Sequence, residues 1–178
     1  MRKLFLFIFL LCSVAKGMAQ QEEGTFRIEP HVGTSITNLT HADMNATVGG
    51  ILGLNAQCQF SERFGVVTGV DYVNYGAKHD HVKLTLGYIE VPMLAKYYVY
   101  KGLSVYTGAE FGYNVCDGRT DILLLSEANK FAAGIPVGMT YDFKHFSINA
   151  QYYLGLTKVY KDFDYRSRGV RITLGYKI

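Results

Sequence analysis

Beyond its first 19 residues, this 178-residue sequence has no long hydrophobic run. An α-helix needs about 20 predominantly apolar residues to cross a bilayer, and the apolar stretch at residues 4–11 is much shorter than that. Only strands could therefore carry the rest of the chain across a membrane. The sequence also lacks a Pro- or Ser-rich linker, a block of like charges and a low-complexity tract. It therefore predicts a single domain.

Motifs for nucleotides, redox chemistry and nucleic acids are also missing. The sequence contains no phosphate-binding loop, no CxxC pair and no basic patch interleaved with aromatic residues, so we predict no cofactor. The 18 Lys and Arg residues exceed the 15 Asp and Glu residues, but Arg2, Lys3 and Lys16 account for the difference. Without these three, the charges balance, and nothing in them indicates a nucleic-acid partner.

The N-terminal segment has the features of a secretory signal peptide. Arg2 and Lys3 form a basic start, residues 4–11 an apolar core, and Gly17-Met18-Ala19 a small-residue cleavage site. We predict a signal peptide at residues 1–19 and an exported chain at residues 20–178.

Alternation of apolar and polar residues dominates the rest of the chain. A side-chain period of two is typical of a β-strand. It predicts eight strands, at residues 25–37, 46–60, 64–75, 83–100, 103–115, 130–143, 146–157 and 168–178. Tight connections at 61–63, 101–102 and 144–145 alternate with longer ones at 38–45, 76–82, 116–129 and 158–167. Outer-membrane barrels alternate in this way, with the short turns in the periplasm.

The polar half of the alternation distinguishes a membrane barrel from a soluble one. A soluble, lipocalin-like barrel should carry many charged residues on that half. Here it holds small residues and neutral amides, such as Gly49, Asn55 and Gln57, which suit a narrow filled lumen. Aromatic residues gather near both strand ends, as in the girdles of membrane barrels. The sequence predicts an all-β fold: a closed, antiparallel, up-and-down transmembrane β-barrel of eight strands in the outer membrane.

Three local features qualify this pattern. The parity of the apolar residues changes near Gly87-Tyr88, which predicts a β-bulge in the strand at 83–100. Pro136 inside a strand predicts an interrupted ladder. Cys58 and Cys116 fall near opposite ends of their strands, beyond the roughly 7 Å Cα limit for a disulfide. We predict that both thiols are free.

Residues 88–98, with the sequence YIEVPMLAKYY, resemble the central strand of the outer-membrane β-barrel domain family of Bacteroidetes, which includes PorT-like proteins. The resemblance implies an eight-stranded outer-membrane barrel and, for most members, no defined biochemical activity. It also implies a role in protein secretion or envelope assembly as an alternative function, with an envelope or secretion protein as partner.

Charged residues at inward-facing positions form the main candidate site. Asp71, Glu110 and Arg171 each lie seven residues from the tight-turn end of their strands, which predicts a common depth in the lumen. The full set of charged residues expected in the lumen is Arg27, Glu29, Asp71, Glu90, Lys96, Glu110 and Arg171. Such a cluster could serve acid–base chemistry or an ion path. Buried charges must pair, however, and an eight-stranded barrel is filled by side chains. We therefore predict a structural plug.

Other candidates are weaker. His145 and Ser147 resemble the His-x-Ser of lipid A deacylases, which makes a lipid-modifying enzyme a further alternative, but no suitably placed acid accompanies them. His79, Asp80 and His81 lack a third ligand strand, so we predict no metal site. Leu123, Leu124 and Leu125 in a long connection are the candidate contact for a ligand or partner. The leading prediction is a non-enzymatic membrane anchor that contacts outer-membrane lipid and presents its loops.

Overall fold

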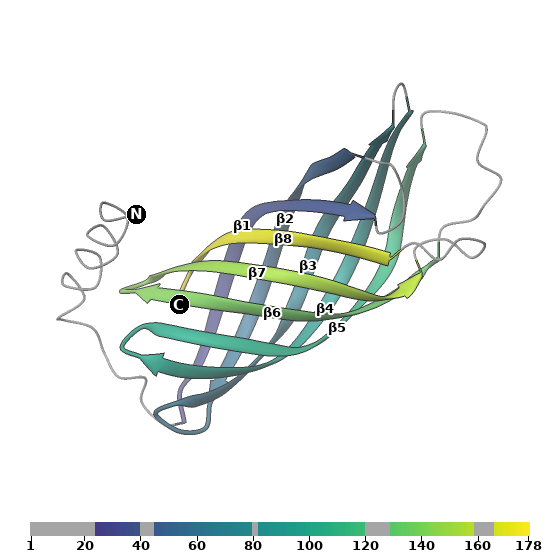
Figure 1. Cartoon of the computed structure of the whole chain (residues 1–178). Coiled ribbons are helices and arrows are strands. Elements are labelled where there is room, and N and C mark those ends of the chain that lie inside the picture. The colour runs from purple at the N-terminus through teal and green to yellow at the C-terminus, as the bar shows by residue number, and fades with distance from the viewer. Residues whose placement is uncertain (1–23, 40–44, 80–81, 120–128, 159–165) are drawn as a thin grey trace, which may run out of the picture.

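The chain folds into a closed antiparallel barrel, seen in a computed structural model that describes residues 24–39, 45–79, 82–119, 129–158 and 166–178 (Figure 1). Each strand pairs with the next, and β8 pairs with β1. The described residues hold eight strands: β1 (Phe26–Leu39), β2 (Asn45–Gln59), β3 (Phe64–His79), β4 (Val82–Tyr100), β5 (Leu103–Arg119), β6 (Phe131–Phe143), β7 (Phe146–Lys158) and β8 (Arg166–Tyr176). This confirms the predicted fold class. In the described part of the chain, no helix is long and apolar enough to cross a bilayer.

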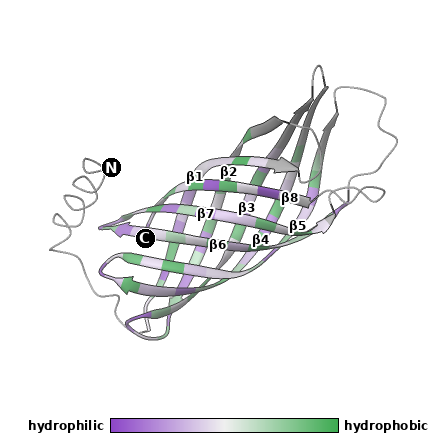
Figure 2. Ribbon diagram, viewed as in Figure 1, coloured by the Kyte–Doolittle hydropathy of each residue, from purple (hydrophilic) through white to green (hydrophobic). Residues whose placement is uncertain are grey.

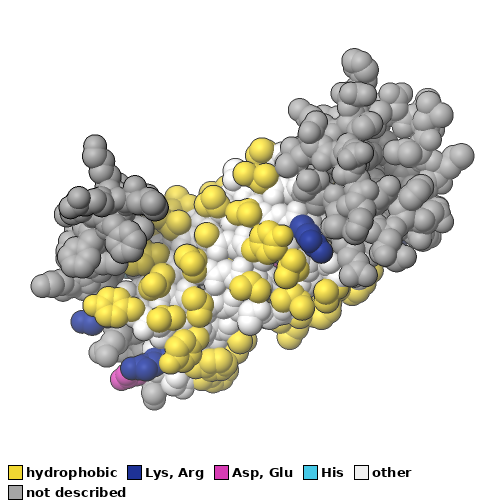
Figure 3. Space-filling view, in the orientation of Figure 1, with side chains coloured by type: hydrophobic (Ala, Val, Ile, Leu, Met, Phe, Trp, Pro, Cys, Tyr) yellow, Lys and Arg dark blue, Asp and Glu magenta, His cyan; other side chains and the backbone are white. Residues whose placement is uncertain are grey.

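The barrel has an apolar outer face. Hydrophobic residues alternate with polar ones along each ribbon (Figure 2), and the side chains of Val48, Leu52 and Ile148 are more than half exposed. Charged side chains such as Glu90, Glu110 and Arg171 are instead buried inside. The space-filling view shows hydrophobic side chains spread over the visible outer surface (Figure 3). This polarity is the reverse of that of a soluble barrel.

The observed strands lie close to the predicted ones. The largest differences are at β3 and β5, which run four residues further, to His79 and Arg119. These extensions lie at the end of the barrel opposite the tight turns. The extension of β3 also corrects the predicted longer connection at 76–82, because β4 begins at Val82 and residues 80–81 alone lie between the two strands. The alternation is weak in both extensions, because Gly76, Asp117 and Gly118 interrupt the apolar positions. Strand length at this end therefore depends on backbone pairing between neighbours.

The predicted β-bulge occurs at the expected place but in the other strand. The register between β4 and β5 shifts between Gly87 and Tyr88, and the unpaired extra residue is Val115 of β5. Val115 and its neighbour Cys116 are both exposed. The strand β4 itself pairs with β3 through Gly87 and Tyr88 without a shift. The assignment of the bulge to β4 was wrong because Leu86 is an apolar residue that faces the lumen, not lipid.

Prolines interrupt the hydrogen-bond ladder without changing its register. Pairing of β5 with β6 stops at Thr107–Val137 and resumes at Glu110–Gly134, so Pro136 is unpaired on that side. Pro92 lies in a similar gap between β3 and β4. Proline has no N–H to donate, which explains why each gap lies on one side of the strand.

Both described cysteines are free and exposed. Cys58 lies at the tight-turn end of β2, and Cys116 lies toward the opposite end of β5. The prediction of two free thiols is confirmed.

Candidate functional site

The centre of the lumen is occupied by one arginine and two glutamates. Arg171 extends from β8, and Glu90 and Glu110 extend from β4 and β5 on the opposite wall. The guanidinium of Arg171 lies 2.7 Å from Glu110 Oε1 and 3.0 Å from Glu90 Oε2. All three side chains are at most 3% exposed. An ion pair of this kind is costly to break, because the remaining charge would be buried without a partner.

Aromatic and amide groups surround this central ion pair. The hydroxyl of Tyr75 donates a hydrogen bond of 2.5 Å to Glu90 and also contacts the Arg171 guanidinium. The guanidinium carbon lies 4.4 Å from the centroid of the Tyr153 ring and 5.5 Å from that of Tyr75, which favours cation–π attraction. Gln151 donates to Glu110 at 3.5 Å. These contacts join β3, β4, β5, β7 and β8 across the lumen.

A second pair lies beside the first. Nε2 of His31 on β1 is 3.2 Å from Oδ1 of Asp71 on β3, and both side chains are nearly inaccessible to solvent. Gly53 lies between them on β2, where a Cβ atom would collide with both. Glycine is therefore required at position 53, because any side chain there would block the contact between His31 and Asp71 across β2.

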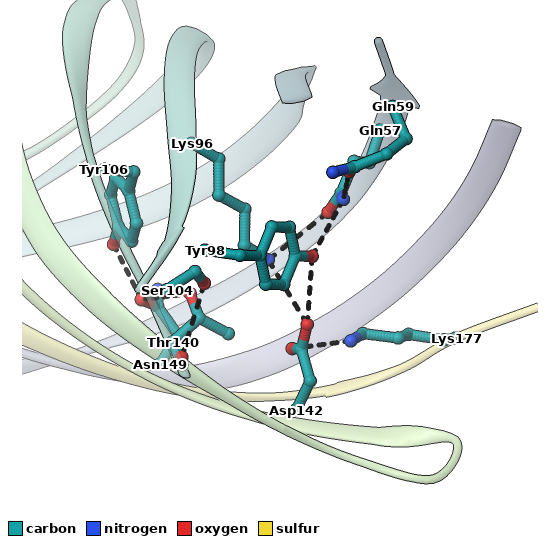
Figure 4. Close-up of polar contacts among 10 residues, drawn as sticks. All are labelled: Gln57, Gln59, Lys96, Tyr98, Ser104, Tyr106, Thr140, Asp142, Asn149 and Lys177. Atoms are coloured by element: carbon teal, nitrogen blue, oxygen red, sulfur yellow. Dashed lines mark hydrogen bonds and ion pairs between the residues drawn. The ribbon is translucent and has the colours of Figure 1, made fainter. Parts of the chain in front are cut away.

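Toward the tight turns, a third cluster is centred on Asp142 of β6 (Figure 4). Its carboxylate lies 2.5 Å from Lys177 Nζ and 3.7 Å from Lys96 Nζ, and it accepts a hydrogen bond of 3.1 Å from Tyr98. Gln57 donates to the Tyr98 hydroxyl and accepts from Lys96. All five side chains are buried. The cluster connects β2, β4, β6 and the segment after β8.

Between the central and tight-turn clusters lies a small polar cavity of about 50 Å³. A water molecule needs at least about 10–15 Å³ of such volume, so the cavity has room for only a few. Its lining includes Asp71, Lys96, Glu110 and Arg171. On the side of the long connections, Tyr75, Leu86, Tyr88 and Ala132 pack together. The lumen is therefore filled along its described length.

The structure places the predicted inward charges as follows. Glu90, Glu110 and Arg171 meet at the centre, whereas Asp71 pairs with His31 and Lys96 joins the Asp142 cluster. Asp71, Glu110 and Arg171 line one cavity, together with Lys96. Arg27 and Glu29 are half-buried in β1, and Glu29 lines the same cavity. Leu123, Leu124 and Leu125 lie outside the described residues.

Sequence reasoning missed several members of these clusters. Tyr75 and Tyr153 were not assigned to the lumen, and neither were His31, Asp142 and Lys177. Asp142 and Lys177 could have been found, because each alternates with apolar neighbours at the end of its strand. Inward tyrosines give no such signal, since an aromatic residue is equally at home on the outer face.

The described residues contain no group of three or more His, Cys, Asp or Glu side chains that could hold a metal ion. Asp80 and His81 lie outside those residues, and only the backbone of His79 is described. His145 is exposed in the turn before β7, with its ring 6.0 Å from that of Tyr176, while Ser147 is buried inside the barrel. The two residues thus have different surroundings, and no dyad forms.

Gly134 offers a direct test of the packing around Arg171. A Cβ atom at this position would overlap the ring of Tyr153, which lies against the guanidinium. We expect Gly134→Ala to lower the free energy of unfolding by about 1–3 kcal/mol, the usual cost of overpacking. Urea titration followed by gel migration of unheated samples would measure it. Gly50→Ala is the control, because a Cβ there meets nothing within 4 Å. Equal stability of the two variants would contradict this account of the packing.

Comparison with known proteins identifies the barrel. The family model for the outer membrane protein beta-barrel domain matches residues 18–161. The chain belongs to this family. It is a small outer-membrane β-barrel protein, and the soluble lipocalin-like alternative is set aside by this match and by the apolar outer face. No curated protein matches the sequence.

Solved structures show the same fold. Neisserial surface protein A superposes with a TM-score of 0.59 at 15% identity, covering 88% of this chain and all of that one. Ail, the attachment invasion locus protein of Yersinia pestis, gives 0.57 at 15% identity with the same coverage. OprG of Pseudomonas aeruginosa gives 0.51 at 13% identity, covering 90% of this chain and 99% of that one. At these identities, the likeness concerns the fold.

Proposed function

We propose that this protein is a non-enzymatic outer-membrane anchor that presents its long connections to a ligand or a protein partner. The observation that carries the proposal is the filled lumen. Three buried polar clusters and an aromatic layer occupy it in the described part of the chain, and the cavity between the central and tight-turn clusters has a volume of about 50 Å³. A barrel without a path through its interior presents its connections as the water-exposed surface available for recognition.

The two ends of the barrel differ in a way that supports this orientation. Tight turns join β2 to β3, β4 to β5 and β6 to β7 at one end of the barrel (Figure 1). At the other end, the connections at 40–44, 120–130 and 159–165 are longer, whereas β3 and β4 are joined by residues 80–81 alone. In outer-membrane barrels, short turns face the periplasm and long loops face outward. The connection between β5 and β6, which contains Leu123, Leu124 and Leu125, is the proposed contact segment.

The arrangement of polar groups favours binding over catalysis. Glu90 and Glu110 share a single arginine and are almost fully buried, so that a substrate could not reach them without displacing the plug. Ser147 is 1% exposed inside the barrel, and His145 lies in the turn outside it. A nucleophilic serine requires a base within hydrogen-bond reach. These contacts support a structural role for the buried charges.

A role like that of PorT proteins in secretion or envelope assembly is the second candidate. It is supported by the resemblance of residues 88–98, which form the central part of β4 and carry Glu90 and Lys96. Affinity capture of the tagged protein from solubilised outer membranes would test it. We expect the wild type to recover envelope machinery. We expect this recovery to be lost when residues 120–128 are replaced by a Gly-Ser linker. Capture of no envelope protein would exclude this candidate.

The filled lumen predicts that the protein does not conduct ions. Purified barrels inserted into a planar bilayer are expected to produce no current steps above the baseline, because no continuous water path passes the Arg171 and Asp142 clusters. The folded state of the protein used should be verified by the difference in gel migration between unheated and heated samples. Stable open-channel steps from the wild type would overturn the proposal, since the lumen would then be a path and not a plug.

A further inference from the structure

The outer face of the barrel is not evenly convex. A shallow groove of about 590 Å³ crosses β4 to β8, and its lining is almost entirely apolar. It is lined by Ala95, Tyr97, Val105, Tyr106, Thr107, Val137, Gly138, Met139, Ala150, Gln151, Tyr152 and Val170. The groove therefore spans five of the eight strands on the lipid-facing side.

The groove arises from the order of large and small side chains. Ala95 and Thr107 face each other on β4 and β5, and Ala150 of β7 faces Met139 of β6. The short side chains of Ala95, Thr107 and Ala150 lie among the larger ones of Tyr97, Met139 and Tyr152. Gly138 and two buried residues, Tyr106 and Gln151, also line the groove.

The groove runs obliquely from one end of the barrel toward the other. At its lower end, Tyr97 and Val105 lie beside the tight turn between β4 and β5. At its upper end, Val170 lies in the half of β8 that is nearer the long connections. Four strand spacings of about 4.8 Å give it a length of roughly 19 Å. Strands in such barrels tilt by about 35–45°, so the groove also descends through the membrane.

A cation lies just beyond the upper end. Arg168 is on the same outward face of β8 as Val170, two residues, or about 7 Å, closer to the long connections. Its side chain is exposed and charged. The outward residues that follow it on β8 are exposed and hydrophobic: Val170, Ile172, Leu174 and Tyr176. Arg168 thus marks the outer boundary of the apolar band.

We propose that the groove and Arg168 together form a binding site for one phosphorylated lipid of the outer leaflet. An acyl chain lies along the groove, and the phosphate contacts the guanidinium. Arginine is well suited to this role because its planar fork of N–H donors matches phosphate oxygens. In the outer leaflet, the phosphate of such a lipid lies at the membrane surface and its acyl chain extends toward the midplane. The cation at the upper end and the apolar groove below it match this order.

A second copy of the chain fits the same surface less well. A two-fold contact would oppose the groove to itself, because both subunits use the same patch. Two concave surfaces would leave the floor at Ala95, Thr107 and Ala150 uncovered, and the two Arg168 side chains would gain no anionic partner. Charge and shape therefore favour a lipid.

Native mass spectrometry of the full chain in detergent tests the proposal with a minimal pair of lipids. The probes are dipalmitoyl phosphatidic acid and dipalmitoylglycerol, which differ only in the phosphate, and inorganic phosphate alone. We expect one phosphatidic acid per barrel, and retention of dipalmitoylglycerol that is about tenfold weaker. Arg168→Gln should weaken retention of phosphatidic acid about tenfold, as expected for loss of a charge-assisted hydrogen bond, and leave dipalmitoylglycerol unchanged. Ala150→Leu should weaken both lipids by partly filling the groove.

Two matched variants control for charge and volume. Lys130→Gln removes another exposed cation near the same end of the barrel, and Ala56→Leu enlarges an outward alanine on β2, outside the groove. Both should retain lipid like the wild type, and all variants should keep the heat-dependent gel migration of a folded barrel. Any of four outcomes would overturn the proposal. They are equal retention of the two lipids, binding of inorganic phosphate alone, unchanged binding by Arg168→Gln or Ala150→Leu, and a dimer without lipid.

Discussion

Replacement of Arg171 by methionine is expected to lower the free energy of unfolding by about 3–5 kcal/mol, the usual cost of removing one partner from a buried ion pair. The loss is large because Glu90 and Glu110 would remain in the lumen without a counter-charge. The cation–π contacts with Tyr75 and Tyr153 would also disappear. Equilibrium urea unfolding in phospholipid vesicles, followed by gel migration of unheated samples, provides the measurement.

A triple variant separates the cost of an unpaired charge from the value of the ion pair. In Glu90→Gln/Glu110→Gln/Arg171→Met, no buried charge is left at the centre, and most of the lost stability should return. Replacement of a whole buried ion pair by neutral groups is often close to neutral. A loss below about 1 kcal/mol for Arg171→Met alone would show that the carboxylates do not depend on this arginine, which contradicts the role of the cluster as a plug.

A charge placed on the outer face should also lower the stability of the barrel strongly. Leu52 lies midway along β2, and the residue is 64% exposed. We expect Leu52→Arg to destabilise the barrel in a bilayer by about 2–4 kcal/mol, the cost measured for arginine near the midplane of membrane barrels. The reason is that the guanidinium must either enter the hydrocarbon or distort the bilayer around it. Unfolding titrations in vesicles of phosphatidylcholine would determine this cost.

The control for this variant is a charge reversal in a tight turn. Glu62 is exposed between β2 and β3, and Glu62→Arg should change stability by less than about 0.5 kcal/mol, as is usual for surface positions. In a barrel surrounded by water, Leu52→Arg would behave in the same way as this control. Equal effects of the two substitutions would therefore be inconsistent with lipid contact at Leu52.

The strands could be predicted from the sequence because their alternation is local. A period of two assigns each residue to a face without knowledge of its neighbours, and the tight turns define where each strand begins. Counting residues from these turns also placed Glu110 and Arg171 at one depth, and the two form an ion pair in the structure. This succeeded because residues on different strands were compared at equal distance from the same edge.

Contacts that depend on several strands at once could not be predicted in this way. Asp71 contacts His31 two strands away, which requires the stagger of both β1–β2 and β2–β3. Tyr75 and Tyr153 approach Arg171 from opposite walls, and tyrosine occurs on both faces of this barrel. The parity change near Gly87 was visible in the sequence, but its assignment to β5 required the pairing of β4 with both neighbours.

The closure of β1 onto β8 has a consequence for assembly. Every other strand pair joins neighbours in the chain, whereas His31 pairs with Gly175 near the opposite end of the sequence. Until that last seam forms, β1 and β8 are open edges with unpaired backbone groups, and such edges recruit other strands. Arg171, which completes the central cluster, is carried by β8 itself. Closure of the seam therefore also fixes the strand that carries the counter-charge of Glu90 and Glu110.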